Sequence, residues 1–245
     1  MSIHLVGGGR DETRLGAVYG GFANEAADHA RARGAGEPRV AVVTVHEPDD
    51  VTQGAEKQAW FAAAVRATAR VSCLPVALPE GAALEAGSLR GLDGMLVAGG
   101  LTPAYATALG PVAQEIRGLV ADGMPYLGFS AGAAVAARRA IVGGYRQGDV
   151  VVCSPDCDED LDELTVVEGL GLVDLTVEVH AAQWGPLTRL MAAVESGMVA
   201  AGVAVDEDTV LVVGDRATHV AGAGRVWWVS RDGAELRVRL EGAGL

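Results

Sequence analysis

Short apolar runs alternate with helix-forming segments rich in small residues through the first half of this 245-residue chain. The apolar runs predict strands at residues 3–6, 39–45, 71–78, 92–97 and 124–127. The segments between them predict helices at residues 16–33, 55–68 and 105–122. Such an alternation forms a parallel sheet with right-handed crossovers and helices on both faces. The sequence therefore predicts an α/β fold with a mostly parallel central sheet, and Pro75 indicates an edge position for its own strand.

The second half of the chain is less regular. Its strands are expected at residues 150–153, 175–180, 203–205 and 209–213, the last two as one interrupted strand. A charged loop is expected over residues 156–163 and a helix over residues 187–195. The segments 225–230 and 235–240 flank an Asp-Gly pair, which is typical of a β-hairpin turn. Because no repeat, low-complexity tract or linker divides the chain, we expect a single domain over residues 1–245.

Composition and charge limit the partners. Half of the residues are hydrophobic but only 4% are aromatic, so small aliphatic residues supply the core, as in helices packed on a Val-rich sheet. The net charge of −13 argues against a nucleic-acid partner and against a membrane surface. Three cysteines do not indicate a disulfide framework, and Cys153 and Cys157 have no second Cys or His pair nearby. We expect neither a metal nor an organic cofactor.

We expect no targeting or membrane segment either. Residues 1–6 lack the basic start and long apolar core of a signal peptide. The chain has no uninterrupted run of about 18 apolar residues, the length needed to span a bilayer. A cytoplasmic location is therefore expected.

The strand at residues 124–127 runs into Gly128-Phe129-Ser130-Ala131-Gly132, and a small-residue helix over residues 133–137 follows. The G-x-S-x-G pattern is typical of a nucleophile elbow, a sharp strand-to-helix turn at which glycines remove clashing side chains. Ser130 would stand at a helix N-terminus, whose free N–H groups favour a developing negative charge. The N–H of Ala131 is the natural first oxyanion donor. The alternative is an ordinary Gly-rich turn with a capping serine.

A serine nucleophile needs a base, and the base usually needs an orienting carboxylate. Among the five histidines, His180 is the candidate base, because it ends an apolar strand just before a loop and a helix. His46 is a candidate only for lining the pocket at the carboxyl edge of the sheet. The candidate carboxylates are Asp149, Glu178, Asp206, Glu207 and Asp208. Periodicity does not choose among the last three.

The ordered motifs of this chain resemble those of peptidase family S51, the family of aspartyl dipeptidase (dipeptidase E) and cyanophycinase. The resembling segments are residues 6–9, 96–100, 128–134, 169–172, the strand that ends at His180, and residues 202–211. Together they cover nearly the whole chain. The resemblance implies a three-layer sandwich of the class I glutamine amidotransferase-like (flavodoxin-like) type, to which the C-terminal β-hairpin is added.

The resemblance implies a role for each candidate catalytic residue. Ser130 would be the nucleophile and His180 the base. Glu207 matches the acid of the cyanophycinase branch, in its Gly-x-Asp-Glu-x-Thr setting. The dipeptidase branch takes its acid from shortly after the elbow, where Asp149 is the nearest candidate. Glu207 is therefore the preferred acid and Asp149 the reserve.

The resemblance also implies groups around the substrate. Gly100 N–H would join Ala131 N–H in the oxyanion hole. The positions that would contact substrate are Leu101, Thr102, Gln183, Trp184 and Arg189. The family has Asn where this chain has Leu101, and cyanophycinases have Gln where it has Val179 and several arginines where it retains only Arg189. The groups expected to grip a β-aspartyl-arginine substrate are therefore mostly absent, and the substrate stays open.

Three functions follow from these residues. The leading hypothesis is a serine hydrolase that cleaves a small peptide or isopeptide amide through an acyl-enzyme, as a monomer or a homodimer. A second is a non-catalytic binding or regulatory member of the same fold. A third is an esterase of the α/β-hydrolase type with Ser130, His219 and either Asp206 or Asp208, but the chain lacks its His-Gly-Gly motif. An amidotransferase is disfavoured because those enzymes use Cys at the position of Ser130.

Overall fold

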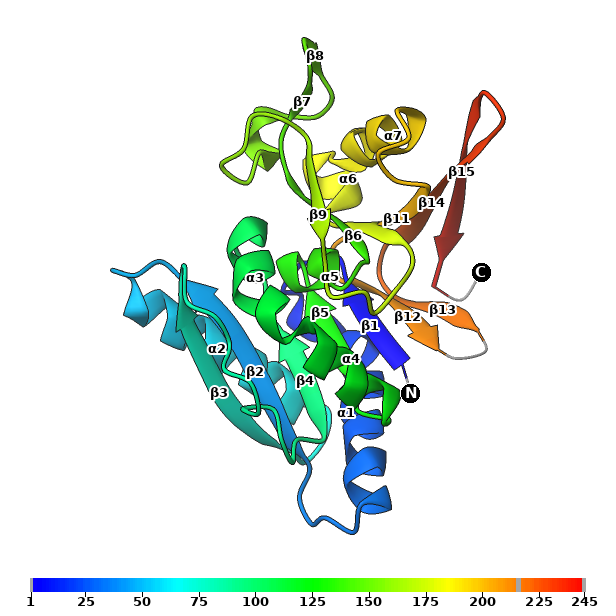
Figure 1. Ribbon diagram of the computed structural model, residues 1–245. Helices are drawn as coiled ribbons and strands as arrows, with labels where there is room; N and C mark the ends of the chain where they lie inside the picture. The colour runs from blue at the N-terminus through cyan, green and yellow to red at the C-terminus, as the bar shows by residue number, and fades with distance from the viewer. Residues whose placement is uncertain (1, 215–216, 244–245) are drawn as a thin grey trace.

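The computed structural model describes residues 2–214 and 217–243 and is built around a seven-stranded sheet (Figure 1). Its strands are β1 (Ser2–Val6), β2 (Arg39–His46), β3 (Ser72–Pro79), β4 (Gly94–Val97), β5 (Tyr126–Phe129), β12 (Thr209–Gly214) and β13 (Thr218–Gly222). Their order is β13-β12-β1-β5-β4-β2-β3. The strands β1 to β5 pair in parallel, whereas β12 and β13 pair antiparallel. The predicted mostly parallel sheet is confirmed, and β3, with Pro75, lies at its edge.

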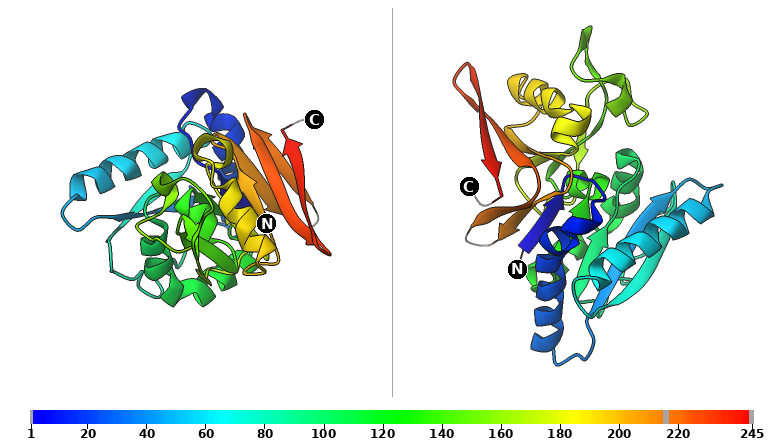
Figure 2. Two further views of the ribbon diagram at one scale, coloured as in Figure 1. Left: turned by 90° about the horizontal axis from the view of Figure 1, so that it is seen from above. Right: turned by 180° about the vertical axis from the view of Figure 1, so that it is seen from behind.

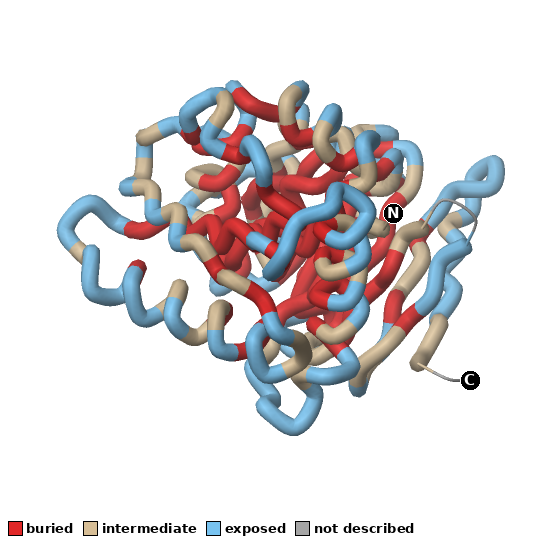
Figure 3. Tube along the Cα trace, turned by 90° about the horizontal axis from the view of Figure 1, so that it is seen from below, coloured by how far each residue is buried: buried red, intermediate tan, exposed pale blue. Residues whose placement is uncertain are grey.

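Helices cover both faces of this sheet (Figure 2). One face packs against α1 (Leu15–Ala32) and α2 (Val51–Arg66), and the other against α3 (Thr102–Leu109), α4 (Ala113–Ala121) and α5 (Ala131–Val135). Successive residues of β2 show the alternation: Val40 and Val42 join the α1–α2 core, whereas Ala41, Val43 and Val45 join the other. Buried residues gather between the layers, and the outer helix faces are exposed (Figure 3).

The helices follow the predicted segments, with α5 shifted by two residues from residues 133–137 and with two larger differences. The first is that α2 begins at Val51 rather than residue 55, because the Asp50 side chain accepts a hydrogen bond from Gln53 N–H at 2.9 Å and caps the helix. The second is that the helix predicted over residues 105–122 is two helices, α3 and α4. A 3-10 turn at Gly110–Val112 separates them, because Pro111 cannot donate a helical hydrogen bond.

A second sheet, not expected from the sequence, contains β10 (Thr176–Glu178), β11 (Ala201–Val205), β14 (Arg225–Asp232) and β15 (Glu235–Gly242) in that order. The hairpin β14–β15 is confirmed, with Asp232 paired to Glu235 across its turn. The interrupted strand predicted over residues 203–213 is wrong. Its halves are β11 and β12, and they belong to different sheets. The turn of residues 206–208 therefore crosses from one sheet to the other.

The remaining elements lie in the upper part of Figure 1. They are β6 (Arg139–Gly143) paired with β9 (Thr165–Glu168), β7 (Arg146–Gln147) paired with β8 (Val150–Val151), α6 (Ala181–Trp184) and α7 (Leu187–Glu195). The last of these matches the predicted helix. In the figure, β6 and β9 lie near α5, whereas β7, β8 and α7 lie at the top. The charged loop lies between β8 and β9 and contains a 3-10 turn at Pro155–Cys157. None of the described helices combines the length and the apolar character that a membrane span requires.

Candidate active site

Ser130 occupies the sharp turn between β5 and α5. Its backbone has φ 52° and ψ −113°, an uncommon conformation for a residue with a side chain. Its N–H donates to the Val6 carbonyl at 2.9 Å, which ties the turn to β1. A Cβ on Gly128 would lie 2.3 Å from the Gly132 carbonyl oxygen, and one on Gly132 would lie 2.2 Å from the Val97 oxygen. Both glycines are therefore required for this turn.

His180 reaches the serine from the start of α6. Its Nε2 lies 2.8 Å from Ser130 Oγ. The residue has φ 52° and ψ 35°, and its N–H donates to the Gly7 carbonyl at 2.8 Å. A Cβ on Gly8 would lie 2.1 Å from Cε1 of the imidazole. The glycine run after β1 thus both anchors the backbone of His180 and leaves space for its ring.

Glu207 contacts the other side of the imidazole. Its Oε1 lies 2.7 Å from His180 Nδ1, and its own N–H donates to Gln183 Oε1 at 3.0 Å. Burial lowers the pKa of His180, and the neighbouring Glu207 carboxylate partly offsets that effect. With Nδ1–H donating to Glu207, a neutral His180 leaves Nε2 free to accept a proton from Ser130.

The three acids of the turn between β11 and β12 have different partners. The buried Asp206 accepts a hydrogen bond from Trp227 Nε1 at 3.0 Å, which ties the turn to β14. Asp208 accepts from the Asp11 N–H at 2.9 Å, which ties the turn to the segment after β1. Glu207, between them, is the acid of the three that contacts the imidazole. The turn that crosses between the two sheets therefore places Glu207 at the imidazole, a choice among the three acids that periodicity did not make.

Other candidates from the sequence lie elsewhere. The Asp149 side chain is fully exposed, 4.0 Å from Arg146, so the structure does not bring the reserve acid to the imidazole. His46 ends β2, where its Nδ1 lies 2.8 Å from the Glu47 carbonyl oxygen, and it is not among the residues that line the cavities beside the serine. His219 is exposed on β13.

The peptide between Gly99 and Gly100 lies beside the serine. Its carbonyl accepts hydrogen bonds from Lys57 Nζ and from Tyr105 Oη, each at 3.0 Å. Because the C=O and N–H of a trans peptide point in opposite directions, these contacts also fix the direction of Gly100 N–H. The φ of Gly100 is 153°, which favours glycine. Neither this N–H nor that of Ala131 donates to another described residue.

Two cavities meet at Ser130. The first has a volume of about 450 Å³, and its lining includes His180, Arg10 and Lys57. The second has a volume of about 320 Å³ and is lined by Leu101 and the acidic loop. Gly100 and Trp184 line both. The Trp184 ring, 52% exposed, stacks on the imidazole with 4.0 Å between ring centroids and 7° between ring planes.

The predicted substrate-contacting residues separate into two groups. Leu101 and Trp184 line a cavity that includes the serine. Thr102 is buried, and its N–H donates to Glu159 Oε2 at 2.8 Å, so it fixes the acidic loop to the start of α3. Gln183 accepts from the backbone of the candidate acid and therefore positions that residue.

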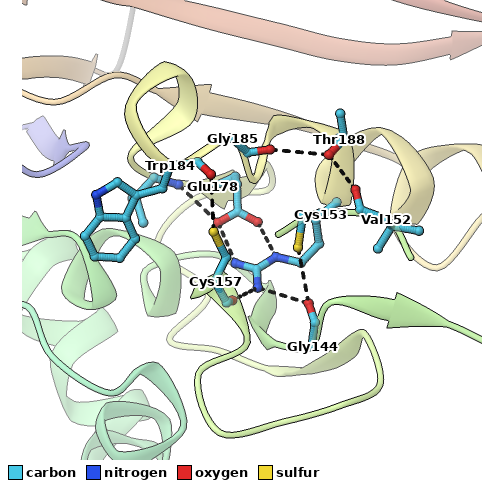
Figure 4. Close-up of polar contacts among 10 residues, drawn as sticks. Gly144, Val152, Cys153, Cys157, Glu178, Trp184, Gly185 and Thr188 are labelled. Atoms are coloured by element: carbon cyan, nitrogen blue, oxygen red, sulfur yellow. Dashed lines mark hydrogen bonds and ion pairs between the residues drawn. The ribbon is translucent and has the colours of Figure 1, made fainter. Parts of the chain in front are cut away.

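Arg189, a predicted substrate contact, lies in a buried polar network, and its partners Glu178 and Cys157 are labelled in Figure 4. It is buried, and its Nε and Nη2 donate to the two carboxylate oxygens of Glu178 at 2.9 and 3.0 Å. Its Nη1 donates to the carbonyls of Gly144 and Cys157. The Cys157 thiol in turn donates to the Trp184 carbonyl at 3.4 Å. This network holds the acidic loop against α6.

Sequence reasoning missed Arg10, Lys57 and Tyr105. Arg10 directly follows the glycine run after β1, so its position in the sequence was a usable signal. Lys57 and Tyr105 lie within helical segments, where a polar group gives no sign of the strand end that it contacts. Only the packing of α2 and α3 against the end of β4 brings these side chains to the Gly99 carbonyl.

Comparisons with known proteins agree with this fold. A family model, that of peptidase family S51, matches residues 57–221. No curated protein sequence matches the chain. Among solved structures, a peptidase from an acI-B1 actinobacterium is 18% identical with a TM-score of 0.71, over 100% of this chain and 95% of that one. A candidate peptidase E protein from Listeria monocytogenes EGD-e is 16% identical with a TM-score of 0.52, over 91% and 98%.

Proposed function

Because this chain belongs to peptidase family S51 and is a peptidase, we propose that it cleaves the amide bond of a small peptide or isopeptide through an acyl-enzyme on Ser130. One observation carries the proposal: a continuous hydrogen-bonded row of Ser130, His180 and Glu207. The three residues come from the end of β5, the start of α6 and the turn between β11 and β12. Such a row is how a hydroxyl becomes a nucleophile at neutral pH.

In the acylation step, the Ser130 oxygen attacks the amide carbon while His180 Nε2 takes the hydroxyl proton. The resulting imidazolium is stabilised by the Glu207 carboxylate at Nδ1. The carbonyl oxygen becomes an oxyanion, and the N–H groups of Gly100 and Ala131 are the proposed donors to it. The C–N bond then breaks, and His180 gives its proton to the leaving amine nitrogen.

In the deacylation step, a water molecule takes the place of the leaving amine. His180 removes a proton from that water as it attacks the ester carbon, and the same oxyanion donors stabilise the second tetrahedral intermediate. The bond to Ser130 breaks, the proton returns from His180 to the serine oxygen, and the acid product leaves. The enzyme returns to its starting state without a redox change.

The strained backbone of Ser130 supports this assignment. Glycine at residues 128 and 132 raises the entropy cost of folding, and a positive φ on a serine costs about 1–3 kcal/mol. A serine that only capped a helix would not need that conformation, and Ser130 makes no side-chain cap bond to α5. The turn instead presents the hydroxyl to the imidazole.

Hydrolysis of a dipeptide and isopeptide library tests the proposal. We expect Ser130→Ala to lower kcat/KM by roughly 10⁴- to 10⁶-fold on any responsive substrate, as losing a catalytic nucleophile does. Ser196→Ala is the matched control, because Ser196 is exposed and only bonds carbonyls of its own helix, α7. Full activity of purified Ser130→Ala would contradict the proposal.

A further inference from the structure

We propose that the cavity beside Arg10 and Lys57 is a subsite for a carboxylate on the leaving portion of the substrate, an inference that rests on the proposed function. The substrate class is then a short peptide cut one residue before its free C-terminus. Four observations carry this assignment: the place of His180, the charges of the two cavities, the way the cations are held, and their lack of partners.

The place of His180 identifies the leaving-group side. The leaving amine must receive its proton from Nε2, so it departs on the side of Ser130 that His180 occupies. His180 and Glu207 line the larger cavity, whereas neither lines the smaller one. The larger cavity is therefore the leaving-group side. Its volume of about 450 Å³ lies within the range of about 300–1,000 Å³ that is usual for small-molecule pockets.

The charges of the two cavities are opposite. Arg10 and Lys57 face the larger one, in a chain whose net charge is −13. Asp156, Asp158 and Glu159 line the smaller one. An anionic group is attracted to the first cavity and repelled from the second. This difference orients a peptide with its carboxylate on the His180 side.

Both cations are held in place before substrate arrives. The Arg10 guanidinium lies over the Trp60 ring, 5.0 Å from its centroid. The Lys57 ammonium donates one hydrogen bond to the Gly99 carbonyl and retains two further N–H groups. A Cβ on Gly100 would lie 3.2 Å from Lys57 Nζ, so this charge adjoins the proposed oxyanion donor. Side chains that are already ordered lose less entropy on binding.

Within residues 2–214 and 217–243, the two cations also lack an anionic partner. Among the described residues, neither Arg10 nor Lys57 forms an ion pair with a carboxylate. The carboxylate that shares their cavity, Glu207, is bonded to His180. Burial and the neighbouring Arg10 charge lower the pKa of Lys57, while Asp50 and Glu80 oppose that effect. Two like charges facing one cavity repel each other until an anion binds between them.

Matched substrates test the subsite. The probes are Xaa-Ala dipeptides and the same dipeptides as C-terminal amides, compared by the ratio of their kcat/KM values. We expect wild type to prefer the free carboxylate by at least roughly tenfold, the factor that corresponds to one charge-assisted contact. Arg10→Gln and Lys57→Gln should each lower the ratio, and the double variant should bring it near one. Arg66→Gln, an exposed cation at the end of the same α2, should leave it unchanged.

The ratio separates this inference from the proposed function. Lys57 also bonds the Gly99 carbonyl, so Lys57→Gln is expected to slow both substrates, but that effect cancels in the ratio. The subsite alone would be overturned by either of two results. In the first, hydrolysis depends on Ser130 but the wild-type ratio is near one. In the second, the double variant still prefers the free carboxylate. Hydrolysis that survives Ser130→Ala would overturn both. If no dipeptide is cleaved, the same comparison is made by binding. Ala-Ala and Ala-Ala amide are each tested for their ability to protect Ser130 from labelling by a fluorophosphonate. Equal protection by the two compounds would overturn the subsite.

Discussion

At the scale of single residues, the protonation of His180 controls the proposed reaction. Its imidazole must be neutral to accept the proton of Ser130. Burial lowers its pKa from the ordinary value of 6.5, because the charged form is poorly solvated, and the Glu207 carboxylate acts in the opposite direction. Activity is therefore expected to be lost as the pH falls through a value below 6.5, where the imidazolium forms and can no longer act as a base.

Glu207→Gln tests this balance. The variant keeps a hydrogen-bonding group at Nδ1 but removes the charge that favours imidazolium, so the acid limb of kcat/KM should move to lower pH. The rate on the plateau should fall by roughly 10²- to 10⁴-fold, because imidazolium is less stabilised in the transition state. The measurement is the pH profile of kcat/KM. Glu195→Gln, which changes an exposed acid, is measured in the same way as the control. An acid limb that stays in place, or moves to higher pH, would count against Glu207 as the partner of the base.

At the scale of elements, the site is formed where the ends of several strands and helices come together. The strands β1, β5 and β10 and the turn after β11 all end near Ser130, as expected for ligand sites at the carboxyl ends of parallel strands. Helix α3 adds a buried contact from the side. Its Tyr105 hydroxyl accepts from Val45 N–H at 3.1 Å on β2 and donates to the Gly99 carbonyl at 3.0 Å after β4. The side chain thus joins three elements behind the proposed oxyanion donor.

Tyr105→Phe tests this connection. We expect kcat to fall by roughly 5- to 50-fold, less than the 10²- to 10³-fold loss of a whole oxyanion donor, with little change in KM. The free energy of unfolding should fall by about 1–3 kcal/mol, because a buried N–H of β2 loses its acceptor. The measurements are steady-state kinetics and urea unfolding, with the buried Tyr19→Phe as control. An unchanged kcat, or a loss equalled by the control, would contradict a role for Tyr105 at the Gly99 peptide.

The elements also show how much the sequence could predict. Strands β1, β2, β4 and β5 were predictable because a strand buried on both faces is a near-continuous apolar run. The edge strand β3 is only partly buried, and its apolar residues together with Pro75 indicated it. The turn at Ser130 was predictable because its glycines cannot be replaced. The choice of Glu207 over Asp206 and Asp208 came only from the family resemblance, because periodicity does not record the crossing between sheets on which that choice depends. The structural position of Arg189 was hidden for a similar reason, since its partners lie in three distant segments.

At the scale of the whole molecule, residues from both sheets and from the start of α6 meet at Ser130. The central sheet supplies the turn that carries Ser130 and the glycine run that accommodates His180. The second sheet supplies the strand before His180 and one end of the turn that carries Glu207. The excess of acidic residues over the molecule leaves Arg10 and Lys57 as a local positive region beside the serine. The global fold therefore determines both the hydrogen-bonded row of Ser130, His180 and Glu207 and the polarity proposed for the substrate.

The most direct test of the central claim is the mass of the intact protein after treatment with a fluorophosphonate. We predict one added phosphonyl group, mapped by peptide mass spectrometry to Ser130, at a rate that falls sharply in His180→Ala. The equivalent His219→Ala, which changes an exposed histidine on β13, should be labelled like wild type. A wild-type protein that takes up no label, or takes it up equally fast without His180, would contradict an activated serine and favour a non-catalytic binding role for this fold.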